Sequence, residues 1–252
     1  MQHQQQSVTI IRPDGRTSGT SIRPLSCQLH SLSRADGSAQ FTCGSTKILA
    51  AVYGPGPSKI PSRERLDQAV IVVVFKQAQY THSSSSSCCS KMTNREMERF
   101  LIDSFSACIC VHTYPKTIIE IVLQVIQADG SVLGNAVNAA VLALMDAGIE
   151  MKSIPIGTTC LIGKDNTILL LDPCGQEEED EEGIMDEKKK CGTTFVLVTD
   201  SIQNNIITCM TLGSNAFLAN SFRISVDAAN QASKAVLMFM RMAIEQVHSH
   251  KS

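Results

Sequence analysis

The chain lacks the apolar segments of a membrane-spanning or secreted protein. No run of about 18 apolar residues occurs among its 252 residues, so we expect no transmembrane helix. Its first six residues, Met1–Gln6, lack the apolar stretch of a signal peptide. A strong charge of one sign is also missing. The net charge of −2 argues against binding nucleic acid by bulk charge alone, so any RNA contact needs local patches.

The cysteines lack the spacing of a metal site. Two of the ten, Cys88 and Cys89, are adjacent, and no second pair follows at zinc spacing. Most of the others stand in apolar strand or helix contexts, such as Cys108 and Cys160. We therefore predict reduced thiols in an intracellular protein and no metal site.

Hydrophobic periodicity and turn residues predict a first group of strands, two helices in the middle of the chain, a second group of strands and a C-terminal helix. The expected strands are 22–33, 38–43, 47–53, 69–75, 117–127, 155–162, 167–171, 193–199 and 205–212. The expected helices are 92–111, opened by a Thr93–Glu96 capping box, 133–147, and a last one from about Asn215 or Asp227 to His248. We place Ala229, Ala232, Ala235, Val236, Phe239, Met242 and Ile244 on its apolar side.

This element order predicts one α+β (mixed α/β) domain over residues 12–248, with antiparallel-rich sheets, a central helix pair and a long C-terminal helix. Residues 1–11 and 249–252 are expected to be tails. A Ser-rich stretch near 82–90 and an acidic one near 175–191 are expected to be solvated surface loops.

One junction in the middle of the chain has the form of an anion site. A buried strand ends at the Asp129–Gly130 turn, and an Ala-rich helix follows. The start of a helix offers backbone N–H groups and a positive dipole end, which suit a phosphate. The side chains that follow, Ser131, Val132 and Leu133, carry no charge.

Three segments together resemble the RNase PH family, over most of residues 12–245. They are Arg12–Arg16 with Ile22–Leu25, then Ala35–Gln40 with Gly44–Pro55, and then Leu123–Gly130 followed by Asn138–Ala140 and Asp146–Gly148. The resemblance is strongest to the small ring subunits of the eukaryotic RNA exosome. It implies the RNase PH fold and a place in a hetero-hexameric ring of RNase-PH-like subunits with cap subunits, through which RNA is threaded. It also implies 3′-to-5′ RNA processing, rRNA maturation and RNA turnover in the nucleus, the nucleolus and the cytoplasm, without a membrane partner.

The resemblance also shows what the anion site has lost. Active relatives hold phosphate with a Gly-Thr-Arg triplet after the Ala-Asp-Gly turn, where this chain has Ser131, Val132 and Leu133. Losing such a charged contact costs on the order of 2–5 kcal/mol. We therefore interpret Gly130–Leu133 as a vestigial phosphate loop in which Val132 and Leu133 pack as core. A second phosphate arginine of the family corresponds to Arg95 or Arg99, unless both are surface residues.

The catalytic carboxylates of active relatives correspond to Asp172 and, six residues on, Glu178. Because Glu178 stands in the acidic run Glu177–Glu182, which repels a polyanion, we treat both as vestigial candidates. No residue is assigned a catalytic role and no cofactor is expected. Phosphate or Mg²⁺ would be needed only for a residual activity.

RNA contact is a separate hypothesis. The residues that correspond to the RNA path are Lys76, Gln77, Lys91, Arg95 and Arg99, which could contact backbone phosphates without sequence preference. Only one aromatic residue, Tyr80, is near them, so base stacking would be poor.

The leading hypothesis is therefore a non-catalytic ring subunit that supports the complex and lines its RNA channel. Two alternatives stay open: a residual phosphorolytic 3′–5′ exoribonuclease, and a metal-dependent nuclease that works as a homodimer through the acidic cluster.

Overall fold

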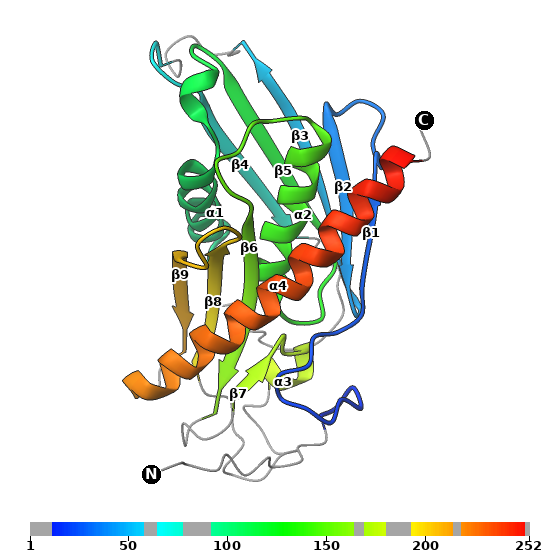
Figure 1. The fold of residues 1–252 in the computed structure, drawn as a ribbon, viewed down its shortest axis with the longest axis vertical. Coiled ribbons are helices and arrows are strands. Elements are labelled where there is room, and N and C mark those ends of the chain that lie inside the picture. The colour runs from blue at the N-terminus through cyan, green and yellow to red at the C-terminus, as the bar shows by residue number, and fades with distance from the viewer. Residues whose placement is uncertain are drawn as a thin grey trace.

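Two sheets enclose a pair of helices, and a long helix covers the far side of the second sheet (Figure 1). The computed structural model describes residues 12–57, 65–77, 92–163, 169–179, 193–213 and 218–249. The expected tail 1–11, the Ser-rich stretch 82–90, Lys91 and most of the acidic stretch lie outside these residues. The α+β class with antiparallel-rich sheets, a central helix pair and a long C-terminal helix is confirmed.

The first sheet has five strands in the order β1-β2-β3-β5-β4. They are β1 (Leu25–Leu29), β2 (Gly37–Cys43), β3 (Thr46–Gly56), β4 (Val70–Gln77) and β5 (Ile118–Gln127). The first three form the expected antiparallel meander, whereas β4 lies at the edge and runs parallel to β5. Alternate residues of these strands, such as Phe41, Ile48 and Ile121, are fully buried in the main core, as a half-covered sheet requires.

The second sheet is antiparallel, and its strands β6 and β8 are covered on both faces. Its strands, in the order β7-β6-β8-β9, are β6 (Pro155–Ile162), β7 (Leu169–Leu171), β8 (Thr193–Asp200) and β9 (Ile206–Leu212). Every residue of β6 is buried. On β8, Val196 and Val198 belong to the main core, while Phe195 and Leu197 form a smaller core with the last helix.

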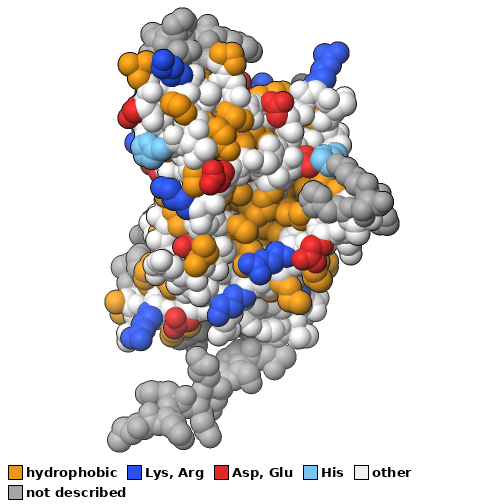
Figure 2. Space-filling model, turned by 45° about the horizontal axis from the view of Figure 1, so that its top comes forward, with side chains coloured by type: hydrophobic (Ala, Val, Ile, Leu, Met, Phe, Trp, Pro, Cys, Tyr) orange, Lys and Arg blue, Asp and Glu red, His pale blue; other side chains and the backbone are white. Residues whose placement is uncertain are grey.

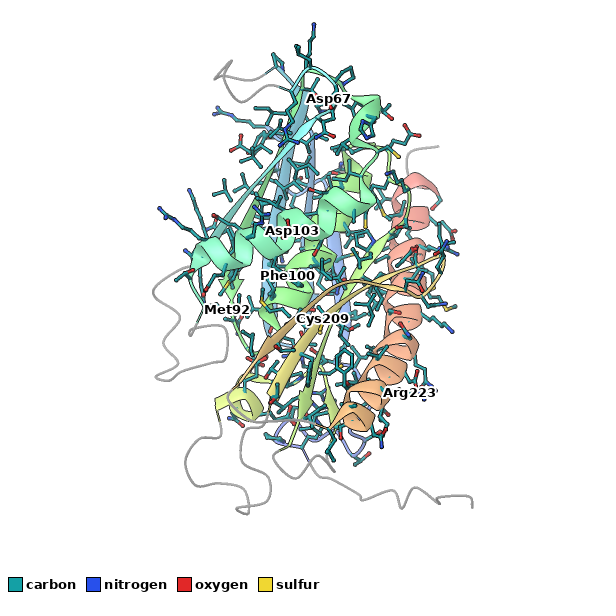
Figure 3. All side chains as sticks on the ribbon, turned by 90° about the vertical axis from the view of Figure 1, so that its left-hand side faces the viewer. Asp67, Met92, Phe100, Asp103, Cys209 and Arg223 are labelled. Carbon is teal, nitrogen blue, oxygen red and sulfur yellow. The ribbon has the colours of Figure 1, made fainter. Side chains whose placement is uncertain are left out.

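The central pair consists of α1 (Asn94–Cys108) and α2 (Val132–Asp146). Helix α1 packs on β4 and β9, and α2 packs on β2, β3 and β6, so both connect the two sheets (Figure 3). All of the first 13 residues of α2 are buried, which explains its Ala-rich, uncharged sequence. Two short helices, η3 (Val111–Thr113) and α3 (Gly175–Glu179), complete this part of the chain.

The predicted capping box opens α1. Thr93 accepts a hydrogen bond from the N–H of Glu96, and the Glu96 carboxylate accepts one from the N–H of Thr93 at 2.8 Å. We expect Thr93→Ala to lower the free energy of unfolding by about 1 kcal/mol, because the N–H of Glu96 loses its side-chain acceptor. Thr93→Ser keeps the oxygen and should restore stability in a urea titration. Equal midpoints for the alanine and serine variants would contradict this role.

The last helix, α4 (Ala219–Ser249), begins between the two expected starts, Asn215 and Asp227, and ends one residue after His248. Ala229, Ala232 and Val236 are buried as expected, but Ala235 and Met242 are exposed, so their assignment to the buried side was wrong. Met238 and Met242 expose 64% and 46% of their surface. Figure 2 shows hydrophobic side chains gathered in a hollow on this side of the molecule, next to Lys and Arg side chains. No helix among the described residues is both long and apolar enough to cross a membrane.

The acidic segment departs most from expectation. Gly175–Glu179 forms helix α3 rather than a solvated loop, and Glu177 and Glu178 are only 3% and 2% exposed. A buried carboxylate needs a cation or N–H groups as partners. These two residues have both, and their partners define the site described next.

Candidate functional site

The Asp129–Gly130 turn and the start of α2 lie against the segment that precedes α3. Gly130 has a φ of +72°, and a Cβ on it would lie 2.4 Å from the carbonyl oxygen of Pro173. Ser131, the residue before the helix, also has a left-handed backbone, with a φ of 53°. Only glycine fits the first position, because its backbone must approach the Pro173 segment so closely.

A carboxylate of the protein itself occupies the start of α2. The Ser131 N–H donates to Oε1 of Glu178 at 2.8 Å, and the Ser131 hydroxyl donates to the Pro173 carbonyl at 2.9 Å. The positive end of a helix favours a negative group in this place. Glu178 therefore lies where a bound anion would have to lie, and both polar groups of Ser131 are engaged within the chain.

The two residues after Ser131 are core residues. Val132 is 1% exposed and Leu133 is fully buried, and both belong to the main hydrophobic cluster. The prediction that they pack the helix start is confirmed. Leu133 stands where the resemblance places a phosphate-binding arginine, and its side chain is enclosed by apolar neighbours.

Asp172 follows β7 with a left-handed backbone, φ 49°, and its carboxylate is held by Arg23. Nε and Nη2 of Arg23 donate to the two carboxylate oxygens at 2.8 and 2.7 Å, and the Arg23 backbone N–H adds a bond at 3.0 Å. Burial raises the pKa of Asp172, but the hydrogen bonds and charge of Arg23 outweigh it, so the pKa lies below its ordinary value. A carboxylate paired in this way is a poor proton acceptor.

The second ion pair joins the N-terminal segment to α3. Nε and Nη2 of Arg12 each lie 2.7 Å from a carboxylate oxygen of Glu177, and both side chains are almost fully buried. Arg12 also donates to the carbonyls of Leu171 and Asp172, at 2.9 and 3.1 Å. Arg16 donates to the Asp172 carbonyl at 2.9 Å. The three arginines thus fix the segment that carries Asp172 and Glu178.

This role of Arg12, Arg16 and Arg23 was not predicted from the sequence. These residues served there only as markers of the family resemblance, and the acidic run was expected in solvent. One signal was available: a run of carboxylates next to apolar strands has to be neutralised if it folds inward, and the N-terminal arginines were the candidates for this.

A small cavity adjoins the site between α2, β6 and α4. Asn135, Thr159 and Asp172 line it together with apolar residues, among them Leu25 and Val236. Its volume of about 30 Å³ has room for one or two water molecules, which need about 10–15 Å³ each by this measure. It is too small for a nucleotide.

The RNA-contact candidates lie apart from this buried network. Lys76 is exposed near the C-terminal end of β4, and Gln77 follows it. Because β4 pairs in parallel with β5, both residues lie at the end of the sheet where β5 leads into the Asp129–Gly130 turn. Arg95 and Arg99 are exposed on α1, and Arg99 pairs with Asp103 at 3.1 Å. Lys91 lies outside the described residues.

Within the described ranges, no cluster of His, Cys, Asp and Glu could hold a metal ion, and all seven described cysteines are free.

Comparisons with known proteins connect the fold and the site to one group. The sequence profile of the 3′ exoribonuclease family (RNase PH), domain 1, matches residues 21–150. The exosome complex exonuclease RRP46 homolog of Arabidopsis thaliana, the counterpart of exosome component 5, is 39% identical over 171 residues, 68% of this chain and 66% of that protein. The crystal structure of rice (Oryza sativa) Rrp46 is similar with a TM-score of 0.74 and 29% identity, over 92% of this chain and 99% of that one. A chain of the Archaeoglobus fulgidus exosome with RNA bound to the active site, 20% identical, shares the fold with a TM-score of 0.71 over 90% of this chain and 91% of that one.

Proposed function

Because this chain belongs to the RNase PH family of 3′ exoribonucleases, we propose that it is a ring subunit of the eukaryotic RNA exosome with no phosphorolytic activity of its own. In this role it supports 3′-to-5′ RNA processing and degradation, including rRNA maturation, by holding the ring together and lining its channel. Its partners are related RNase-PH-like subunits, cap subunits and RNA. We place it in the nucleus, the nucleolus and the cytoplasm.

The observation that carries this proposal is the Glu178 carboxylate at the start of α2. Phosphorolysis needs an inorganic phosphate held in line with the scissile bond and cations that neutralise its charge. Here a carboxylate would repel that phosphate, and a buried leucine replaces the arginine. Arg23, the cation beside the turn, is already bound to Asp172 at both carboxylate oxygens.

RNA contact is proposed for the exposed basic residues rather than for the buried site. Lys76, Arg95 and Arg99 are free of the core and can reach backbone phosphates, and Gln77 and Lys91 complete the set. Such contacts would be weak and independent of sequence.

One observation favours residual phosphorolysis as the second candidate. Asp172 and Glu178, six residues apart, both lie beside the Gly130 turn. Glu178 accepts a hydrogen bond from the Ser131 N–H, and Asp172 accepts one from Arg23. Nη1 of Arg23 in turn lies 3.6 Å from the Asp129 carboxylate. A phosphate would have to displace Glu178 before it could react, so we expect any such activity to be very slow.

Purification of the tagged chain from cells tests the ring assignment. We expect a stoichiometric set of related RNase-PH-like subunits in the eluate. Recovery of the chain only as a monomer or a homodimer would contradict the proposal.

A further inference from the structure

Two polar side chains in the wall of the small cavity between α2, β6 and α4 keep groups that the fold does not satisfy. Neither Nδ2 of Asn135 nor Oγ1 of Thr159 forms a hydrogen bond with another described residue. Both residues line the cavity and are only 6% and 4% exposed, so bulk solvent does not supply the missing bonds. A buried amide or hydroxyl group without a partner is unfavourable, and two such groups beside one cavity indicate a ligand.

The neighbouring polar side chains of the wall already have partners within the chain. Asn138, one turn along α2 from Asn135, forms two hydrogen bonds with the backbone of Gly157, at 2.9 and 3.0 Å. The Thr158 hydroxyl donates to the carbonyl of Leu197 at 3.4 Å. The two unsatisfied groups are therefore a specific feature of this wall, on the facing sides of α2 and β6.

A glycine leaves room for the Thr159 hydroxyl. Gly134 lines the same cavity, and a Cβ on it would lie 2.7 Å from Oγ1 of Thr159. An alanine at this position would press on the hydroxyl group. The volume of about 30 Å³ that remains is enough for one or two water molecules.

We propose that this cavity is a binding site for one or two ordered water molecules that link Asn135 on α2 to Thr159 on β6. Water fits because it both donates and accepts: it can accept from the amide Nδ2 and donate to the hydroxyl oxygen. A buried water molecule needs two to four polar partners. Asp172, the one charged side chain among the lining residues, adds a third.

Other ligands fit the site less well. An apolar molecule would leave the amide and the hydroxyl group without partners, and a larger polar ligand exceeds the volume. The bound water would attach the first turn of α2 to the strand beneath it, beside the two hydrogen bonds of Asn138. This inference goes beyond the ring function and does not depend on it.

A high-resolution crystal structure of the full wild-type chain tests the site directly. We expect a density peak in the cavity within about 2.7–3.2 Å of both Nδ2 of Asn135 and Oγ1 of Thr159, the usual range of hydrogen bonds. A cavity without density, or a direct hydrogen bond between the two side chains, would overturn the proposal. This reading needs no variant to fold.

Thermal melts of two threonine variants give an independent reading, because a wet and a dry cavity predict opposite signs. In Thr159→Val the bound water loses a partner, so the melting temperature should fall by about 2–4 °C, the shift for one lost hydrogen bond in a chain of this size. In a dry cavity the same change would remove an unpaired hydroxyl group and raise the melting temperature.

Thr199→Val is the matched control. The Thr199 hydroxyl is also buried and also lacks a partner among the described residues, but Thr199 does not line the cavity. Its melting temperature should therefore stay level or rise. A melting temperature of Thr159→Val that does not fall below that of the wild type would contradict the water site.

Discussion

Arg12→Ala is expected to lower the free energy of unfolding by about 3–5 kcal/mol, because the buried Glu177 carboxylate loses its bidentate cation, and the cation that it keeps, Arg16, lies 3.9 Å away. The two side chains are 0% and 1% exposed and share two bonds of 2.7 Å. Urea unfolding followed by circular dichroism measures the change. The pair joins residues 165 positions apart, so its loss should also release α3 from the N-terminal segment.

Two further variants separate this effect from a general loss of charge. Arg99→Ala breaks an exposed ion pair, whose side chains are 77% and 50% exposed, and should change stability by no more than about 0.5 kcal/mol. Arg12→Met with Glu177→Leu removes both charges and should cost less than Arg12→Ala alone. If Arg12→Ala and Arg99→Ala unfold at the same urea concentration, the buried pair does not stabilise the fold.

Gly157→Ala should destabilise the protein by about 3 kcal/mol, the upper end of the usual effect of overpacking a core. A Cβ on Gly157 would lie 2.3 Å from the carbonyl oxygen of Gly134 and 2.9 Å from Cβ of Val137. Helix α2 would have to move away from β6. That movement would strain the two hydrogen bonds between the Asn138 side chain and the Gly157 backbone, at 2.9 and 3.0 Å.

Gly56→Ala is the matched control, since a Cβ on Gly56 would meet no atom within 4 Å. Thermal melts of the two variants should differ clearly, with Gly56→Ala close to the wild type. Equal melting temperatures would mean that the contact between α2 and β6 tolerates a methyl group and does not position the start of α2.

Strong local patterns predicted most of the fold. β6 has the bounds that its apolar run indicates, and the Thr93–Glu96 box opens α1 as expected. The order of the strands was less accessible, because the parallel pairing of β4 with β5 depends on contacts between distant segments. The Asp129–Gly130 turn was located correctly, and so was the packing of Val132 and Leu133.

The acidic segment was misjudged for a physical reason. Composition indicates solvation for a run of carboxylates, whereas the distant partners Arg12 and the Ser131 N–H make burial favourable for Glu177 and Glu178. The carboxylate at the start of α2 thus depends on a tertiary contact over 47 residues. A local pattern cannot reveal such a contact.

We propose that the Glu178 carboxylate has taken the place of phosphate at the start of α2, and an assay of RNA degradation tests this. The purified chain is incubated with a 3′-labelled oligoribonucleotide, with and without inorganic phosphate, and nucleoside diphosphates are quantified. We expect no phosphate-dependent release. Release that requires phosphate and is abolished by Asp172→Asn would contradict the claim, and cleavage that requires a divalent metal but not phosphate would point instead to a metal-dependent nuclease.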